Sequence, residues 1–296
     1  MTLEHRHVDA RPSARVAVIG ARGFVGSAVT ARLRTAAVAV VAIGSDDVDL
    51  LAPGSDARLR TRLDGCDAAV FVSAIAPAKA LTTVIDNLHM VEAAAAALDD
   101  GSRHVIYISS DAVYADDVAM VTDATATAPT SLHGAMHLTR EIALRHLLGD
   151  RLCVLRPTLL YGVDDPHNGY GPNRFLRQAE AGEEIRLFGD GEERRDHVHV
   201  DDLARVVHTA LGRRSFGVLD VATGQSTSFS DVAHLAVAVA GANVAVVGTP
   251  RQNPITHRYF DIAPRLGAYP DLAMTGLEDG LRRVHSQRLL SQRPAG

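Results

Sequence analysis

The sequence predicts an α/β protein built on a parallel sheet with helices on both faces. Two observations indicate this fold class. Short apolar runs of strand length alternate with helical segments up to the turn-rich stretch Asp164–Pro172, and such alternation is typical of βαβ units. In addition, 47% of the 296 residues are apolar and 22% are charged, as in globular proteins that bury a large core.

The expected elements follow one another in a regular order. Each expected strand is a continuous apolar run, which suits a strand buried on both faces of a parallel sheet. The expected strands are Val16–Ile19, Val38–Ile43, Ala68–Ser73, His104–Ser109 and Leu152–Arg156. The expected helices are Ser27–Leu33, a segment through Leu88 and Val91 to Leu98, and Ser131–Leu148.

The turn-rich stretch divides the chain into two parts. We expect residues 15–165 to form the doubly wound sheet, with segments in 196–222 returning to it. Residues 166–195 and 223–285 are expected to form a smaller C-terminal lobe. The ends, residues 1–14 and 287–296, are expected to be loose.

The charge and the cysteine count argue against several classes of protein. A net charge of −5 gives no electrostatic footprint for nucleic acid or an anionic membrane. Cys66 and Cys153 imply neither a disulfide framework nor a metal site. No run reaches the roughly 18 apolar residues of a membrane span, and the N-terminus has no apolar leader. We therefore expect a soluble, cytoplasmic protein without a bound metal.

The segment VAVIGARGFVG places three glycines between the first strand and the first helix. In such a loop Gly20 permits the tight turn, Gly23 lets the backbone approach a pyrophosphate, and Gly26 allows close helix–strand packing. The helix N-terminus supplies unpaired N–H groups and a positive dipole end. This context predicts a Rossmann-type dinucleotide site. Further cofactor-binding candidates are Arg22, Phe24, Val25, Ser73 and Ala74.

The end of the second strand bears on which dinucleotide binds. An acid there would accept the ribose 2′-OH of NAD, whereas a nearby arginine would suit the 2′-phosphate of NADP. The strand runs out through Ile43-Gly44-Ser45, and the first acid, Asp46, comes late. Arg22 lies within the glycine loop, where it is either a phosphate ligand or a solvated arginine. We expect NAD(P), with NADP favoured over NAD.

Four segments occur in a recognisable order: the glycine loop, ISSDAVY (Ile108–Tyr114), LRPTLLYG (Leu155–Gly162) and RRDHVHVDDLA (Arg194–Ala204). Together they resemble the extended short-chain dehydrogenase/reductase family, whose NAD-dependent epimerases and dehydratases mostly act on nucleotide sugars. The resemblance covers about residues 15–285. It implies a Rossmann domain, a C-terminal substrate-binding lobe, a nucleotide-linked sugar as substrate and a homodimer.

The resemblance also implies roles for individual residues. Ser110 would hydrogen-bond the reacting sugar oxygen, and Asp111 would take part in proton transfer, although it could instead cap the loop. Arg195 would bind a substrate phosphate, although it could instead pair with Asp196 or Glu193. Three more residues match family positions, Asn87 for substrate and Asp49-Leu50 for adenine.

The sequence departs from the family where the chemistry is carried out. The family's active pair is Tyr-x-x-x-Lys, but the matching segment reads His133-Gly134-Ala135-Met136-His137. Of the 30 basic residues only Lys79 is a lysine, and no tyrosine lies four residues before it. Leu159 also stands where many epimerases have a substrate-binding asparagine.

A histidine pair makes chemical sense at these positions. Tyrosine has a reference pKa of about 10 and needs a cation to help it ionise, whereas histidine titrates near 6.5. A lysine one helical turn away would repel an imidazolium. We therefore expect His133 to be the acid/base and His137 to donate to the nicotinamide ribose. The alternative is a decayed site. His197 and His199 are expected to be structural.

These features lead to one main functional hypothesis and two alternatives. We expect an NAD(P)-dependent epimerase or dehydratase that acts on a nucleotide-linked sugar through a transient keto intermediate. The first alternative is an NADPH-dependent keto-sugar reductase. The second is an inactive NAD(P)-binding protein, which the loss of both tyrosine and lysine would favour.

Overall fold

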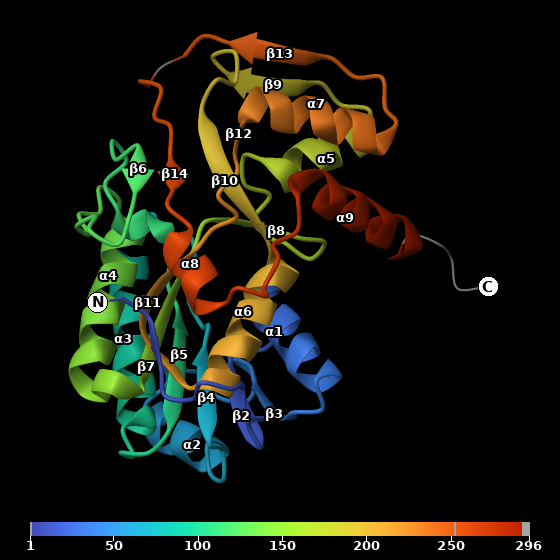
Figure 1. Ribbon diagram of the computed structural model, residues 1–296. Coiled ribbons are helices and arrows are strands. Elements are labelled where there is room, and N and C mark those ends of the chain that lie inside the picture. The colour runs from blue at the N-terminus through green and yellow to red at the C-terminus, as the bar shows by residue number, and fades with distance from the viewer. Residues whose placement is uncertain (1, 252, 292–296) are drawn as a thin grey trace.

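The computed structural model describes residues 2–251 and 253–291, and it has two parts (Figure 1). One part is a seven-stranded sheet with helices on both faces. The other is a smaller lobe of short strands and helices, which lies beyond one end of that sheet (Figure 1). The expected α/β fold with a doubly wound, mostly parallel sheet is confirmed.

The seven strands of the main sheet lie in the order β1-β11-β7-β5-β4-β2-β3. All neighbouring pairs are parallel except β1 with β11. Because β2 pairs with β3 on one side and with β4 on the other, the chain changes direction across the sheet at β2. Such a switch point leaves a crevice at the carboxyl ends of the strands. The strands are β1 (Glu4–His5), β2 (Arg15–Ile19), β3 (Ala39–Ile43), β4 (Ala68–Phe71), β5 (His104–Ile108), β7 (Leu152–Pro157) and β11 (Ser215–Val221).

Helices bury the two faces of this sheet in two separate cores. Helices α1 (Phe24–Thr35) and α6 (Val200–Arg213) pack on one face, where Leu33 and Leu203 are fully buried. Helices α2, α3 and α4 cover the other face around residues such as Leu59 and Leu144. This double covering explains why β2, β3, β4, β5 and β7 read as mainly apolar runs. The three helices of the second face are α2 (Ser55–Arg62), α3 (Leu81–Leu98) and α4 (Leu132–Leu148).

The smaller lobe has its own core around Phe175, Phe229 and Leu281. Three small sheets contribute to it or join it to the main part, in the pairings β12-β10-β8, β13-β9 and β14-β6. The strands outside the main sheet are β6 (Met120–Val121), β8 (Leu159–Tyr161), β9 (Ile185–Phe188), β10 (Arg194–His199), β12 (Ser226–Ser228), β13 (Val246–Thr249) and β14 (Tyr259–Phe260). Helices α5 (Pro172–Glu180), α7 (Phe229–Ala240) and α9 (Leu277–Ser291) build the lobe's core, whereas α8 (Ala263–Ala268) packs against β11. In the main part, 3-10 turns lie at Asp111–Val113 and Gly149–Arg151.

The structure differs from the sequence-based expectation at the ends of the chain and in the returning segments. The N-terminal arm was expected to be loose, but Glu4 and His5 pair with β11 as an edge strand. At the other end, α9 continues to Ser291, and residues 292–296 lie outside the described part. Of the segments expected to return to the sheet, α6 and β11 do so, whereas β10 belongs to a small sheet of its own.

Candidate active site

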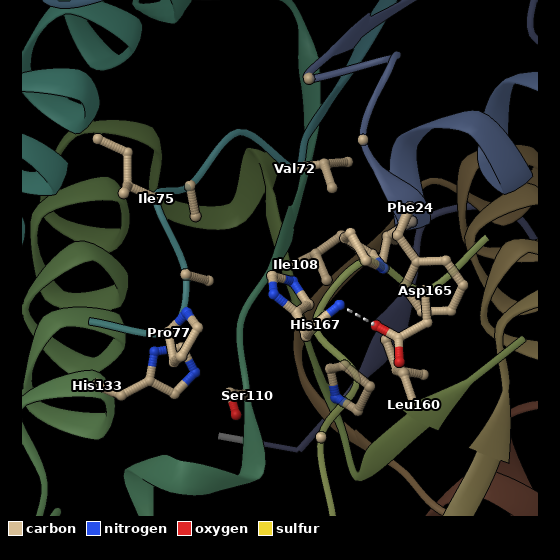
Figure 2. Close-up of a pocket in the computed structure, with 18 of the residues that line it drawn as sticks. Phe24, Val72, Ile75, Pro77, Ile108, Ser110, His133, Leu160, Asp165 and His167 are labelled. Carbon is tan, nitrogen blue, oxygen red and sulfur yellow. Dashed lines mark hydrogen bonds between the residues drawn. The ribbon is translucent and has the colours of Figure 1, made fainter. Parts of the chain in front are cut away.

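A cavity of about 740 Å³ lies where β2 and β4 end and the smaller lobe begins. Figure 2 shows His133 and Ser110 on one side of it and Leu160 and Asp165 on the other. Its volume is within the usual range for ligand pockets. The cavity therefore occupies the crevice at which doubly wound sheets bind their ligands. The predicted site residues that line it are Gly20, Arg22, Gly23, Phe24, Val25, Ser73, Ala74, Ser110, Asp111, His133 and His137.

The glycine loop forms one wall, and two of its three glycines have no room for a larger residue. Gly20 has a φ of +93°, and a Cβ on it would lie 2.7 Å from the backbone nitrogen of Ser73. A Cβ on Gly26 would lie 1.9 Å from the carbonyl oxygen of Gly20, so α1 can approach β2 only with glycine there. These contacts support the structural reasons for glycine at both positions.

The start of α1 is open to an anionic ligand. Among the described residues, no side chain caps its first turn and no acidic residue lies within that turn. Backbone N–H groups at such a helix start favour negative charge, and a pyrophosphate supplies it. The backbone cradle and the open helix start together fit a dinucleotide.

Arg22 lies at the far end of the glycine-loop wall, where two carboxylates hold its guanidinium. Its guanidinium pairs with Asp46 at 2.9 Å and with Asp47 at 3.0 Å, beside Gly44 at the end of β3. Gly44 and Ser45 line the cavity. The expected adenine-contacting residues are absent from the described lining: Asp49 is exposed and Leu50 is buried in the core.

The two α4 histidines lie next to each other at the opposite wall. Their ring centroids are 4.7 Å apart with the rings edge to face. Gly134 lets this end of α4 pack closely, because a Cβ there would lie 1.9 Å from the carbonyl oxygen of Ala112. That contact brings His133 to the turn that begins at Ser110, as the resemblance implied.

His133 is half-buried, and its Nδ1 accepts a long hydrogen bond of 3.4 Å from the backbone N–H of Ala78. Burial, and then the charge of His167, lower the pKa of His133 below its usual value of 6.5. The imidazole is therefore neutral at pH 7 and available to accept a proton.

His137 is buried more deeply, with an exposed fraction of 6%. Its Nδ1 lies 2.8 Å from the phenol oxygen of Tyr107 on β5. Burial first, then the charges of His133 and Arg140, hold the pKa of His137 well below its usual value. His137 is therefore also neutral, and it still lines the cavity.

Ser110 and Asp111 form the floor between the two walls. The Ser110 hydroxyl accepts the backbone N–H of Ala112 at 3.2 Å, which caps the 3-10 turn. The Asp111 side chain is only 13% exposed, and Arg258 lies 3.7 Å from its carboxylate. Burial raises the pKa of Asp111, while Arg258 and Arg195 oppose this shift. Asp111 therefore holds a proton more readily than an exposed aspartate.

A buried polar network supports this floor from behind. Glu141 on α4 accepts hydrogen bonds from Ser109 at 2.6 Å and from two nitrogens of Arg156. Arg156 also donates to Tyr114, and Tyr114 donates to Asp220 at 2.9 Å. Because Glu141 and Arg156 satisfy each other's charge, this network fixes α4 against β7.

Two predicted substrate-binding residues do not face the cavity. Asn87 is fully buried and engaged, because it bonds the backbone of Ile75 and Thr83 and accepts from Arg140. It therefore supports the loop after β4 instead of meeting a substrate. Arg195 donates to the carbonyl and hydroxyl oxygens of Thr256 and lies outside the described cavity lining.

Three residues of this region were not identified from the sequence. His167 lies on the loop after β8 and faces the cavity from the side opposite α4 (Figure 2). Tyr107 and Arg140 lie behind His137, on β5 and α4. The sequence offers one signal for Arg140, because an arginine three residues after His137 lies on the same helix face. Nothing in the local sequence distinguishes Tyr107 from other strand residues.

Comparisons with known proteins establish the family. The model of the NAD dependent epimerase/dehydratase family matches residues 16–222. The chain belongs to this family, and the resemblance inferred from the sequence motifs is confirmed.

Its relatives carry several activities. A dTDP-4-dehydro-6-deoxy-D-allose reductase of Streptomyces bikiniensis is 34% identical over 33% of this chain and 31% of its own length. A UDP-glucose 4-epimerase of Mycolicibacterium smegmatis is 33% identical over 64% of this chain and 58% of its own length. The match thus spans only 31% and 58% of the length of these two relatives. The structure of a Thermus thermophilus UDP-glucose 4-epimerase complex with NAD has a TM-score of 0.75 at 19% identity, covering 92% and 98% of the chains.

Two features are absent from the part of the chain that the structure describes. No helix in ranges 2–251 and 253–291 is long and apolar enough to cross a bilayer. Within the same ranges, no group of three or more histidine, cysteine, aspartate or glutamate side chains is arranged to hold a metal ion.

Proposed function

We propose that this chain is an NAD(P)-dependent enzyme that acts on a nucleotide-linked sugar, as an epimerase or dehydratase, through a transient keto intermediate. The observation that carries the proposal is the arrangement of the cavity. A dinucleotide cradle forms one wall, and a serine with two neutral histidines faces it. This arrangement provides for hydride transfer and for proton transfer in one enclosed space.

Ser110 and His133 are the residues proposed to act on the reacting oxygen. The bound dinucleotide would supply hydride transfer, and the protein would supply orientation and proton transfer. To act as the base, neutral His133 must carry its ring proton on Nδ1, so that unprotonated Nε2 takes the hydroxyl proton and returns it later, while Ser110 hydrogen-bonds the same oxygen. In that tautomer Nδ1 cannot accept from Ala78, so the long 3.4 Å contact must be given up before the proton is transferred.

Asp111 favours the dehydratase form of this proposal. Loss of water from a keto sugar needs an acid that protonates the leaving hydroxyl. The raised pKa of Asp111 suits that role, and Asp111 is one of the residues that line the cavity.

The choice of dinucleotide stays a prediction in favour of NADP. Gly44 and Ser45 line the cavity at the end of β3, and the Arg22 guanidinium lies against Gly44. A 2′-phosphate would have to replace Asp46 as a partner of Arg22, and the Asp46 side chain is 84% exposed and free to move. The name of the family and the NAD bound to the Thermus thermophilus enzyme favour NAD instead of NADP.

Arg195 remains our proposed ligand for a substrate phosphate. In the described structure its guanidinium donates to the carbonyl and hydroxyl oxygens of Thr256 and to the carbonyl of Arg194. A phosphate must therefore compete with three neutral acceptors, and an anion is the stronger partner for an arginine.

We also propose that the chain is a homodimer in the cytoplasm. Helices α3 and α4 carry exposed apolar side chains that a partner could cover. The clearest examples are Leu81 with 64%, Ile85 with 43% and Ile142 with 58% exposure. Both cysteines are buried and unpaired, which is compatible with a reducing compartment. Sedimentation of the wild type and of Ile142→Glu would test the dimer, since the glutamate should yield monomers.

Two other functions are tested by the same experiment. A keto-sugar reductase would use the same cavity, and Leu159 at its edge gives it support, since an apolar residue there lacks the epimerase amide. If His133 and His137 take no part in a reaction, the chain would be a protein that binds NAD(P) without turnover.

The deciding experiment combines extraction of bound nucleotide with assays of UDP-, ADP-, GDP- and dTDP-linked sugars. An epimerase or dehydratase should retain NAD(P) through purification and recycle it. A reductase should consume NADPH against a 4-keto sugar. Tight NAD(P) binding with no turnover of any of these sugars would contradict the enzymatic proposal.

A further inference from the structure

A buried tyrosine and a buried arginine lie directly behind His137. We propose that Tyr107 and Arg140 are positioning residues that keep His137 neutral with its proton on Nε2, so that it donates a hydrogen bond to a ribose hydroxyl of the dinucleotide. The inference rests on the proposed function only for the identity of the ligand. The protonation state of His137 follows from the protein alone.

The hydrogen bond between Tyr107 and His137 has one reasonable direction. Tyr107 is 1% exposed, and its phenol oxygen lies 2.8 Å from Nδ1 of His137. Among the described residues, this oxygen has no other hydrogen-bond partner. If Nδ1 carried the proton, the buried phenol O–H would have no acceptor, at a cost comparable to a lost hydrogen bond. Tyr107 therefore donates to Nδ1, and the ring proton lies on Nε2.

The charges around this pair favour the same state. Burial, assisted by Glu141 and opposed by Arg140, raises the pKa of Tyr107 to about 12, so the phenol keeps its proton. On α4, His133 and Arg140 lie on the same side as His137 and would both repel an imidazolium. Nε2 has no protein partner in ranges 2–251 and 253–291, and His137 lines the cavity. Its N–H is therefore available to a ligand.

Arg140 is a cation without an anionic partner. It is fully buried, and within the described structure no carboxylate lies within 4 Å of its guanidinium. Instead it donates to the carbonyl of Ser73 at 2.6 Å and to Asn87 at 3.2 Å. It also stacks over the rings of Phe71 and Tyr107, at 4.6 and 5.3 Å.

This buried cation gives a physical reason for the missing lysine. A lysine at position 137 would place an ammonium beside Arg140 without a carboxylate to separate them, and burying two like charges together is costly. A neutral N–H donor avoids the repulsion and still offers one hydrogen bond toward the cavity. The buried charge of Arg140 thus explains why a histidine, and not a lysine, stands at position 137.

The first test reads the tautomer directly by NMR of protein labelled with ¹⁵N in its histidine rings. His137 is assigned from the signal that His137→Phe removes. We expect Nε2 to be protonated and Nδ1 unprotonated from about pH 6 to 8. Tyr107→Phe should mix the two tautomers. The matched control is Tyr269→Phe, which removes another buried phenol, bonded to Ser215 and remote from the cavity, and should leave the His137 signal unchanged.

The second test is a double-mutant cycle on dinucleotide affinity, measured by calorimetry with NADH and NADPH. His137→Phe and Tyr107→Phe should each weaken binding about three- to tenfold, as expected for one neutral hydrogen bond. Because Tyr107 acts through His137, the double variant should bind no more weakly than His137→Phe alone. Additive losses would show that Tyr107 is merely structural and would overturn the proposal.

The outcomes separate this inference from the proposed function. A proton on Nδ1, or a tautomer unchanged by Tyr107→Phe, overturns the positioning role whatever the protein binds. If the tautomer behaves as expected but neither dinucleotide binds, the proposed function and the ribose contact fail, while the positioning of His137 by Tyr107 is upheld.

Discussion

The molecule contains two pairs of histidines that are close in sequence, one on α4 and one on β10, and the surroundings of the two pairs differ. His133 and His137, on α4, face a cavity, and each has one ring nitrogen in contact with a protein donor. His197 and His199, on β10, are 3% and 2% exposed. Neither nitrogen of His197 has a partner among the described residues, and burial, followed by the charge of Arg195, lowers its pKa to about 3.

The difference shows what separates a reactive histidine from one that only fills space. Both pairs are neutral at pH 7, so charge state does not distinguish them. What distinguishes them is access combined with orientation. In the α4 pair a donor fixes one nitrogen while the other can reach a ligand. In the β10 pair both nitrogens of His197 are buried without a partner among the described residues, at a cost in stability, whereas His199 uses its Nδ1 to cap α6 and does not reach a ligand.

The largest expected effect separates the two pairs by activity. His133→Phe keeps a flat ring but removes the exchangeable proton, so turnover should fall by about 10²–10⁴, as on loss of a general acid/base. His197→Phe is the matched control and should change kcat/KM by less than about twofold. Steady-state kinetics on any nucleotide sugar that the wild type converts would measure both. Equal losses of activity in His133→Phe and His197→Phe would contradict the difference proposed between the two histidine pairs.

A smaller effect should follow from displacing α4, the helix that carries His133 and His137. A Cβ at position 134 would lie 1.9 Å from a backbone oxygen, so Gly134→Ala must displace α4 from the Ser110 turn. We expect a loss of about 3 kcal/mol in the free energy of unfolding, near the upper end of overpacking costs, and reduced activity. Gly267→Ala, which has open space around it, is the control. Denaturant titration measures the change, and equal stability of the two variants would count against the close packing.

Buried His197 of the β10 pair should make the free energy of unfolding depend on pH. Below pH 6.5 the unfolded chain protonates its histidines, whereas folded His197 stays neutral until about pH 3. Stability is therefore lost as the pH falls through this window, by up to about 1.4 kcal/mol per pH unit for such a group. His197→Phe should recover about 2 kcal/mol at pH 5 relative to pH 7. An unchanged acid limb in thermal or denaturant unfolding would contradict this account of His197.

The smallest effect concerns the other end of the cavity. Arg22 is half exposed, so its contribution to binding a 2′-phosphate should be modest, about fivefold. Arg22→Ala should weaken NADPH and leave NADH unchanged. Asp46→Asn, which removes a competing carboxylate, should tighten NADPH. Calorimetric titration with both dinucleotides decides the matter, and a preference for NADH that neither change affects would exclude NADP as the cofactor.

The sequence alone predicted the main sheet because its elements are encoded locally. A strand covered on both faces, such as β4, must be apolar throughout, and the glycine loop needs Gly20 for its positive φ and Gly26 for its close contact with Gly20. The ends of the chain were harder, since a two-residue edge strand such as Glu4–His5 has no periodicity to recognise.

The candidate site was predicted only where a motif carried it. Ser110 and the α4 histidines were found from the spacing of family segments. The residues that set their chemistry come from elsewhere, because Tyr107 and Ala78 meet α4 only through the tertiary fold. The bonds of Asn87 to the loop after β4 could not be predicted for the same reason, since burial decides whether an amide faces a ligand or a loop.

The central claim is that a neutral histidine on α4 has taken over proton transfer in this family's site. The most direct measurement is the pH profile of kcat/KM for the wild type beside His133→Tyr. Because burial and the charge of His167 lower the pKa of His133, wild-type activity should fall only below pH 6.5. In the variant the limb should move toward the tyrosine range near pH 10. The same acidic limb in both proteins would contradict the claim.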